Sequence, residues 1–240
     1  MKKLSASIAL ALILVLFASA PASGAGLKGR SAFSGMGHLG FPISGFADQE
    51  KGMAKAGYGF AINLEHFLSD HFAVGGNFSY LVFGSKTGHF EEEVRDIIYR
   101  ELRRWYEVDA DVKQELPTFG VFGRYLVRPY SQACPYAKLG LGFGKLSLTG
   151  DAKVNGWNAE ATASFDSKFY FSLGPGILYR MSEDVALVLE VAYVRVLTDG
   201  TESQAAITAG TYELKEDWGL DFDTQYFGVY TGVCLFFGGK

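Results

Sequence analysis

The strongest constraint on this chain is a two-residue alternation in its last strand-like run, Tyr226–Phe237. One set of alternate residues is bulky, apolar or β-branched: Phe227, Val229, Thr231, Val233, Leu235 and Phe237. The residues between them are mostly glycine and tyrosine: Tyr226, Gly228, Tyr230, Gly232, Cys234 and Phe236. Because a β-strand sends alternate side chains to opposite faces, this run predicts a strand that separates two different environments.

Seven further runs alternate in a similar way, which gives eight predicted strands. The predicted strands are Arg30–Ile43, Lys55–Phe67, His71–Ser85, Glu115–Val127, Cys134–Leu148, Asp166–Arg180, Val185–Thr198 and Asp223–Phe237. The segments between them alternate in length. The short ones are 68–70, 128–133 and 181–184, and the long, polar ones are 44–54, 86–114, 149–165 and 199–222.

The composition of the two strand faces indicates which solvent each one meets. In the second run, Tyr58, Phe60, Ile62 and Leu64 alternate with small or polar residues. A water-facing strand surface usually carries Lys, Glu and Thr, whereas the second face here is mostly Gly and Ser with a few charges. An apolar outer face with a small, polar inner face is typical of transmembrane barrels, whose closure pairs every backbone group.

We therefore predict an all-β fold, an eight-stranded antiparallel up-and-down transmembrane β-barrel with long extracellular loops. Eight strands enclose an interior that side chains just fill. The alternative is a soluble, lipocalin-like barrel in the periplasm, with its apolar face turned inward around a ligand.

The N-terminus has the features of a secretory signal peptide. Lys2 and Lys3 precede a short apolar stretch, Leu4–Phe17, and small residues follow it. The stretch is shorter than the roughly 20 residues of a spanning helix, which makes an anchoring helix the weaker alternative. We assign residues 1–22 to the signal peptide and residues 23–240 to one barrel domain, with cleavage after Ala22 or Gly24.

Charge and motif content exclude several functional classes. The 240 residues carry a net charge of -4, so the chain lacks the basic surface of a nucleic-acid-binding protein. The sequence contains no metal-ligand spacing and no nucleotide-binding loop that precedes a helix, so we expect no metal and no cofactor. The two cysteines, Cys134 and Cys234, fall on the inward face of strands that are not neighbours. A disulfide needs Cα atoms within roughly 7 Å, so we expect free thiols.

The architecture resembles the small eight-stranded bacterial outer-membrane barrels, which include the OmpA transmembrane domain, OmpX and the opacity proteins. That family ends in a strand of the form polar-any-glycine-any-any-apolar-any-aromatic, and Tyr230, Gly232, Leu235 and Phe237 occupy these positions. Three residues, 238–240, follow where the family usually ends. The resemblance implies the bacterial outer membrane as the location, and outer-membrane lipid, lipopolysaccharide and the barrel assembly machinery as partners. Both termini and the short turns would then face the periplasm.

Charged residues on the inward face cluster in the periplasmic half of the predicted barrel. They are Glu65, Arg124, Lys138, Arg180 and Glu190. A charge buried alone costs several kcal/mol, so these residues must be paired. We expect Glu65 and Glu190 to pair with Arg124 and Lys138 as a plug, with Arg180 at its rim. The pairs would serve either as structural filling or as a charged constriction in a narrow pore.

The second long loop contains apolar residues at helical spacing: Val94, Ile97, Ile98, Leu102 and Trp105. This spacing predicts an amphipathic helix outside the barrel. Its apolar side would cover the protein's own loops, or it would form a surface for a ligand or an unidentified extracellular partner.

One turn has the composition of a catalytic triad. His66 and His71 flank the first short turn, and Ser69 and Asp70 lie between them. The turn lies at the periplasmic end, away from surface lipid, and a solvated turn uses the same residue types. We therefore predict a non-enzymatic barrel with a plugged lumen and a structural or loop-mediated role. The alternative is a narrow channel or a conduit for small hydrophobic molecules, as in OmpW-like barrels.

Overall fold

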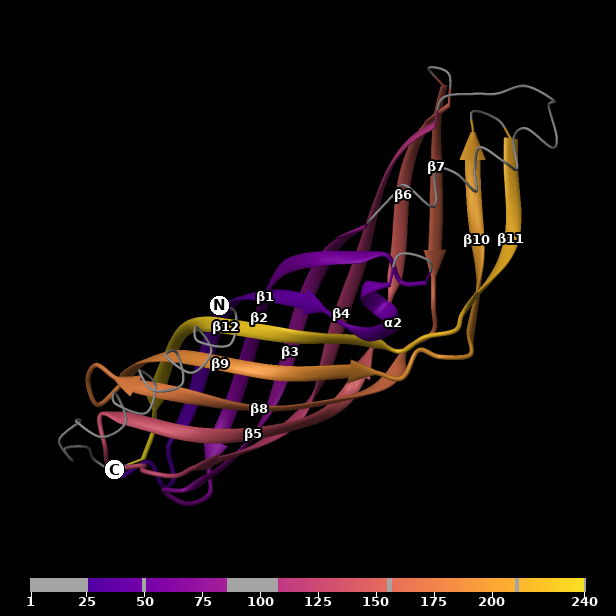
Figure 1. Cartoon of the computed structure of the whole chain (residues 1–240). Coiled ribbons are helices and arrows are strands. Elements are labelled where there is room, and N and C mark those ends of the chain that lie inside the picture. The colour runs from indigo at the N-terminus through magenta and orange to yellow at the C-terminus, as the bar shows by residue number, and fades with distance from the viewer. Residues whose placement is uncertain (1–25, 49–50, 86–107, 155–156, 210–211, 240) are drawn as a thin grey trace, which may run out of the picture.

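The computed structural model describes residues 26–48, 51–85, 108–154, 157–209 and 212–239 (Figure 1). Within these ranges, twelve strands and one short helix are present, and the strands form one antiparallel sheet. The predicted signal peptide (1–22) and the predicted loop helix (Val94 to Trp105) lie outside the described residues. None of the described helical segments has the length and hydrophobicity to cross a bilayer.

Eight of the strands close into a barrel. They are β1 (Ser31–Pro42), β2 (Ala54–Phe67), β3 (Phe72–Ser85), β4 (Val108–Leu126), β5 (Ala133–Gly144), β8 (Lys168–Arg180), β9 (Val185–Val196) and β12 (Thr224–Phe237). Strand β4 pairs with β5, and β12 pairs with β1 from Ser31 opposite Phe237 to Pro42 opposite Tyr226, which completes the ring. The prediction of an eight-stranded antiparallel barrel is therefore confirmed.

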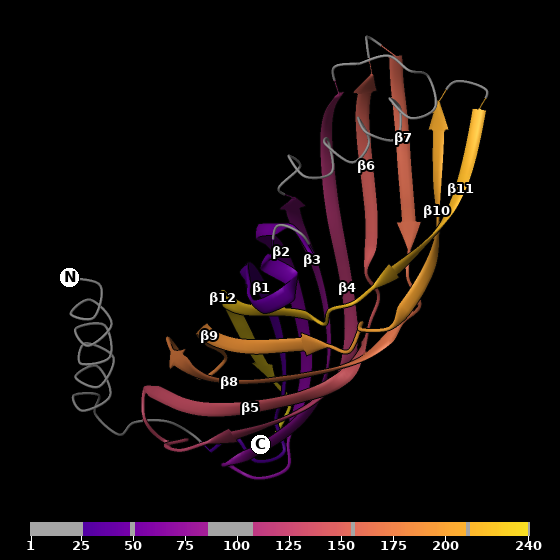
Figure 2. The ribbon, with the colours of Figure 1, turned by 45° about the vertical axis from the view of Figure 1, so that its right-hand side comes forward.

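The other four strands extend the barrel wall beyond one rim. They are β6 (Ser147–Val154), β7 (Trp157–Ser164), β10 (Thr201–Ala209) and β11 (Tyr212–Leu220). Residues 118–126 of β4 pair with β5, and residues 108–115 of the same strand pair with β6. The order β4-β6-β7-β10-β11 forms a sheet that rises from the barrel, and we call it the sheet extension (Figures 1 and 2).

The long, polar connections predicted at 149–165 and 199–222 contain most of the residues of the sheet extension, which the sequence did not assign to strands. Strand β4 also begins at Val108 instead of Glu115, and β5 ends at Gly144 instead of Leu148. The alternation that marks a membrane strand depends on one face meeting lipid. It is weak in these hairpins, which extend past the barrel rim, and their strand structure follows from backbone pairing with the strands beside them.

The polarity of the barrel follows from its connections. The C-terminus and the turns β2–β3, β4–β5 and β8–β9 lie at one end, and the sheet extension lies at the other (Figure 1). In this family of architectures the short turns face the periplasm, so the sheet extension lies on the extracellular side.

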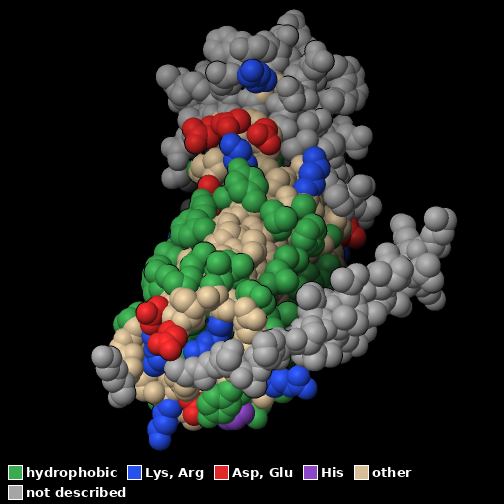
Figure 3. All heavy atoms as spheres, turned by 90° about the vertical axis from the view of Figure 1, so that its left-hand side faces the viewer, with side chains coloured by type: hydrophobic (Ala, Val, Ile, Leu, Met, Phe, Trp, Pro, Cys, Tyr) green, Lys and Arg blue, Asp and Glu red, His purple; other side chains and the backbone are tan. Residues whose placement is uncertain are grey.

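The strand faces separate as the alternation predicts. In β12 the outward side chains Phe227, Val233, Leu235 and Phe237 are exposed, whereas the inward side chains Tyr226, Tyr230, Cys234 and Phe236 are buried. Figure 3 shows the molecule from the left-hand side of Figure 1, with hydrophobic side chains in a band along the barrel wall. Charged side chains lie at both ends of this band. This apolar band is the surface that meets the hydrocarbon of the membrane.

Candidate functional site: a filled lumen

The first ion pair in the lumen joins strands β2 and β4. Nη1 of Arg124 lies 2.6 Å from Oε1 of Glu65, and both side chains are fully buried. Strand β3 runs between these two strands and presents only small residues at this level, Gly75 opposite Glu65 and Ala73 opposite Arg124. A Cβ at Gly75 would lie 2.8 Å from the Cβ of Glu65, so the absent side chain leaves room for the pair.

The second ion pair repeats this arrangement across strand β8. Nζ of Lys138 on β5 lies 3.2 Å from Oε1 of Glu190 on β9, and the Tyr136 hydroxyl donates to Oε2 of Glu190 at 2.9 Å. Strand β8 contributes Gly174 opposite Lys138 and Gly176 opposite both Tyr136 and Glu190. A side chain at Gly176 would overlap the Tyr136 ring, so glycine is needed for this contact.

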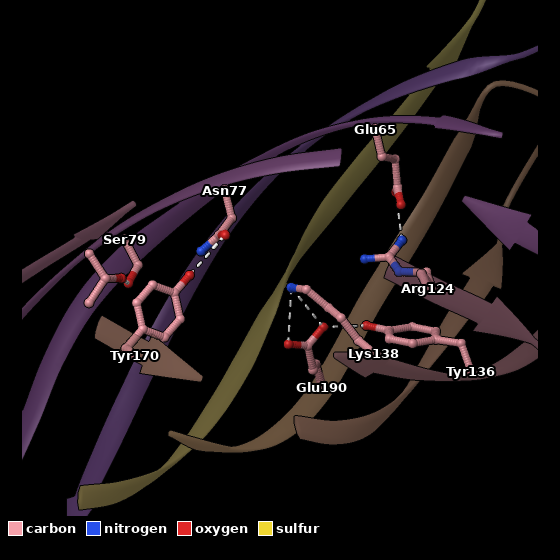
Figure 4. A network of polar contacts seen from close by, with 9 residues as sticks. Glu65, Asn77, Ser79, Arg124, Tyr136, Lys138, Tyr170 and Glu190 are labelled. Carbon is pink, nitrogen blue, oxygen red and sulfur yellow. Dashed lines mark hydrogen bonds and ion pairs between the residues drawn. The ribbon is translucent and has the colours of Figure 1, made fainter. Parts of the chain in front are cut away.

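The rings of Tyr136 and Phe122 join the two ion pairs into one cluster, and Figure 4 shows Tyr136 beside Arg124 and Glu190. The guanidinium carbon of Arg124 lies 4.3 Å from the ring centre of Tyr136 and 5.7 Å from that of Phe122. The ammonium of Lys138 lies 4.6 Å from the Phe122 ring centre. Such cation–π contacts stabilise a buried cation, most strongly where water is excluded. We call Glu65, Arg124, Tyr136, Lys138 and Glu190 the charge network.

The structure thus brings together four of the five charged residues singled out in the sequence, and each of the two acidic residues pairs with a basic one. The fifth, Arg180, is buried near the periplasmic end of β8 and donates to the Pro129 carbonyl oxygen at 3.2 Å. Sequence reasoning missed Tyr136 and Phe122. The alternation could have pointed to both residues, because Phe122 lies two residues from Arg124 on β4 and Tyr136 lies two residues from Lys138 on β5. Residues two apart on a strand face the same side, so both rings were expected to point inward.

Uncharged polar side chains fill the level above the charge network. The Tyr170 hydroxyl donates to Oδ1 of Asn77 at 3.0 Å, and the hydroxyls of Ser79 and Thr118 lie 2.7 Å apart (Figure 4). The cavity bounded by this layer and the charge network has a volume of about 20 Å³. That is space for about one water molecule among these side chains.

An apolar cap closes the extracellular end of the lumen. The short helix α2 (Ser44–Ala47) lies in the β1–β2 connection and buries Phe46 completely. The Phe46 ring lies 4.9 Å from the ring centre of Phe83 and 6.2 Å from that of Phe222. The Gln114 side chain, itself buried, anchors the connection by donating to the Gly52 carbonyl oxygen at 2.6 Å.

A second cap crosses the periplasmic end and comes from the residues just before β1. The Leu27 side chain is fully buried, and the Gly29 N–H donates to the Phe67 carbonyl oxygen at 2.8 Å. The guanidinium of Arg30 lies 5.5 Å from the Phe236 ring centre and forms an ion pair with Asp184 at 2.5 Å. Sequence analysis predicted neither cap, because an isolated Phe or Leu in a connection has no periodic pattern.

Asp70 fastens the periplasmic cap to the turns. Its Oδ1 accepts hydrogen bonds from the N–H groups of Leu27 and Lys28 at 2.6 and 2.9 Å, and its Oδ2 accepts one from the Tyr130 hydroxyl at 2.7 Å. These bonds favour the ionised carboxylate and lower the pKa of Asp70 below its usual value. The hydrogen bond from the Lys28 N–H has the largest effect on this pKa, and the hydrogen bond from the Tyr130 hydroxyl has the second largest.

The lowered pKa of Asp70 predicts a loss of stability in acid. The pKa of Asp70 in the folded protein lies below its value of about 3.9 in the unfolded chain. The stabilisation of the folded state by the ionised carboxylate is therefore complete above a pH of about 3.9, and it is lost as the pH falls through the folded pKa. The unfolding free energy of the wild type should therefore exceed that of Asp70→Asn by a constant amount above about pH 5, and by a shrinking amount below about pH 4. Urea unfolding of both proteins at a series of pH values measures this difference. A difference that stays constant down to about pH 3 would contradict the prediction.

The residues with triad composition do not hydrogen-bond to one another as a triad. His66 Nδ1 lies 3.1 Å from the Ser31 hydroxyl, and His71 Nδ1 lies 2.8 Å from the Leu126 carbonyl oxygen. Ser69 accepts a hydrogen bond from the Phe72 N–H, and Asp70 holds the periplasmic cap. In the part of the chain that the structure describes, no group of three or more His, Cys, Asp or Glu side chains is arranged to hold a metal ion.

Cys134 and Cys234 are buried free thiols, as expected. They belong to β5 and β12, which strands β8 and β9 separate in the barrel. The residues of the proposed assembly signal all lie on β12, with Leu235 and Phe237 exposed on the outer wall and Tyr230 buried in the lumen. Recognition of these residues by the barrel assembly machinery stays a prediction.

The fold and its faces agree with a sequence comparison. Residues 8–229 match the family model described as the outer membrane protein beta-barrel domain. The chain belongs to this outer-membrane barrel family. Its location is therefore the bacterial outer membrane, and the resemblance to small outer-membrane barrels is confirmed.

Two solved structures of outer-membrane barrels are similar in fold. A major outer membrane protein from Thermus thermophilus aligns with a TM-score of 0.56 and 11% identity, covering 86% of this chain and 99% of that one. OprG from Pseudomonas aeruginosa aligns with a TM-score of 0.52 and 15% identity, covering 90% of this chain and 99% of that one. Identities this low support the fold alone. Among curated proteins, no sequence matches this chain.

Proposed function

We propose that this protein is a non-enzymatic, non-conducting outer-membrane barrel that supports the sheet extension and loops as its interaction surface. The observation that carries the proposal is the filled lumen. From the periplasmic end to the extracellular end, its layers are the cap at Leu27, the charge network, the polar layer around Tyr170 and the cap at Phe46.

The energetics of these layers support a permanent closure. An ion path through the charge network would have to separate buried ion pairs, and each separation leaves charges without a partner in a low-dielectric interior. The hydrogen bonds of His66, His71, Ser69 and Asp70 to groups outside a triad support the non-enzymatic part of the proposal.

The position of the sheet extension supports its role as the interaction surface. Strands β6, β7, β10 and β11 continue the wall on the extracellular side, and β11 is the edge strand of the described sheet. A sheet that projects beyond a rigid barrel presents its surface to the outside at a fixed orientation, which suits binding to a partner.

Conductance in planar lipid bilayers tests the closed lumen. We expect the folded protein to give no steady single-channel current, because the polar cavity of about 20 Å³ holds only about one water molecule. Successful insertion is checked by the heat-dependent gel shift of the reconstituted barrel.

The contrary outcome separates a pore through the lumen from leakage around the protein. A steady current whose ion selectivity changes in Lys138→Gln, but not in the surface control Lys51→Gln, would place ions beside the charge network. That result would replace the closed barrel with the narrow-channel alternative. Lys51 is a suitable control because it lies at the extracellular surface, where it pairs with Asp221 at 2.8 Å.

A further inference from the structure

The lipid-facing wall of the barrel contains an apolar hollow, apart from the lumen. Its volume is about 720 Å³, and it lies over strands β2 to β5 and the start of β8. The side chains that shape it include Leu64, Phe78, Phe119, Val121 and Phe143. The hollow is wide open on its outer side and its surface is almost entirely apolar, so it is an open groove on the wall and not an enclosed pocket.

The strand register explains why the wall is hollow at this place. Phe78, Phe119, Phe143 and Phe169 lie opposite one another in a row across four neighbouring strands. In the next outward row toward the periplasm, Gly76 lies between Leu64 and Val121. Because Gly76 has no side chain, this row has a gap directly below the aromatic row.

A cation, Lys145, follows β5 beyond the extracellular end of the hollow and is not one of the residues that line it. Lys145 is exposed and follows Phe143 by two residues, about 7 Å along an extended chain. Its backbone N–H donates to the Pro117 carbonyl oxygen at 3.1 Å, which holds this position beside β4. Within the described ranges the Lys145 ammonium has no ion-pair partner. Glu115, an outward carboxylate at this end of β4, is hydrogen-bonded to Tyr80.

We propose that the hollow binds one acyl chain of an anionic outer-leaflet lipid, whose phosphate-bearing headgroup contacts Lys145. The hollow lies on the wall that faces hydrocarbon, so an acyl chain is the molecule that surrounds it. Lipid tails are as apolar as the wall, so selective binding comes from packing into the gap at Gly76 and from the charge at Lys145. This site is separate from the closed lumen and does not depend on the proposed function.

Native mass spectrometry of the folded barrel in neutral detergent tests the site. The probes are phosphatidylglycerol and phosphatidylcholine with identical acyl chains. We expect the wild type to retain one phosphatidylglycerol molecule in preference to phosphatidylcholine. Lys145→Gln should lower this preference about fivefold, because one basic residue near an anionic headgroup contributes about that factor.

Filling the gap tests the binding of the chain. Gly76→Leu should weaken phosphatidylglycerol retention about tenfold by occupying the hollow. The variant is expected to fold, because the nearest atom to a Cβ at this position is the Gly120 carbonyl oxygen at 3.7 Å, an ordinary contact. The matched control is Gly37→Leu on β1, which is exposed, meets nothing within 4 Å and lies outside the hollow. It should bind lipid like the wild type.

Three results would overturn the proposal. Equal lipid retention by the wild type and Gly76→Leu, each with its heat-dependent gel shift intact, would show that the hollow holds no chain. An unchanged lipid preference in Lys145→Gln would remove the headgroup contact. A wild-type dimer that Gly76→Leu converts to a monomer would show that a second copy of the chain covers the hollow.

Discussion

The variant Arg124→Met should lose about 3–5 kcal/mol of unfolding free energy, because it leaves the Glu65 carboxylate without its ion-pair partner. Both side chains are fully buried, and their charged atoms lie 2.6 Å apart. The measurement is equilibrium urea unfolding of the barrel in lipid vesicles, followed by the heat-dependent gel shift.

A double variant separates the cost of an unpaired charge from the cost of lost packing. Glu65→Leu combined with Arg124→Met removes both charges, and we expect it to recover most of the lost stability because apolar replacements of a buried pair are often tolerated. Lys51→Met, which breaks a solvent-exposed pair with Asp221, should leave the unfolding transition unchanged. If Arg124→Met were as stable as the wild type, Glu65 would not be a buried charge that depends on Arg124.

The second large effect is expected at a glycine in the barrel wall. Gly174 faces the lumen from β8, and a Cβ there would overlap the Val191 carbonyl oxygen and lie 2.6 Å from the Cα of Ala192. Gly174→Val should therefore destabilise the barrel by about 3 kcal/mol, the upper end of typical overpacking costs, because backbone atoms cannot rotate away. The measurement is the folded fraction after refolding, read from the gel shift.

The control for this prediction is a glycine in open space. Gly37→Val on the outer face of β1 meets nothing within 4 Å and introduces a residue that favours strands. It should fold as well as the wild type. If both variants folded equally well, the tight packing between β8 and β9 at Gly174 would not limit the barrel.

The alternation of residues was sufficient to predict the barrel, since lipid on one side and a narrow lumen on the other impose different residues on the two faces. The same parity placed Glu65, Arg124, Lys138 and Glu190 on one surface at a similar level. The hydrogen bond between the Tyr136 hydroxyl and Glu190 could not be predicted from the alternation. Its hydroxyl reaches Glu190 across β8, and this contact depends on the sideways stagger of three strands.

The sheet extension and the two caps could not be predicted from the alternation either, and the cause is a different one. The hairpins β6–β7 and β10–β11 form because their backbones pair with strands beside them, and that pairing does not require an apolar face. Phe46 and Leu27 are single apolar residues in connections, and they are buried only because the connections fold back over the two ends of the barrel.

The sequence by itself therefore determined the number of membrane strands, their faces and the set of charges inside the lumen. These properties follow from the solvent that each side chain meets, and alternation along one strand records that solvent. Only the tertiary structure decided which charges pair, how the lumen is closed and where the outer wall is hollow. Each of these depends on residues from different strands at one level, such as Gly76 beside Leu64 and Val121. The register between strands decides which residues lie at one level. Register is a property of the whole closed barrel and cannot be derived from the sequence of one strand alone.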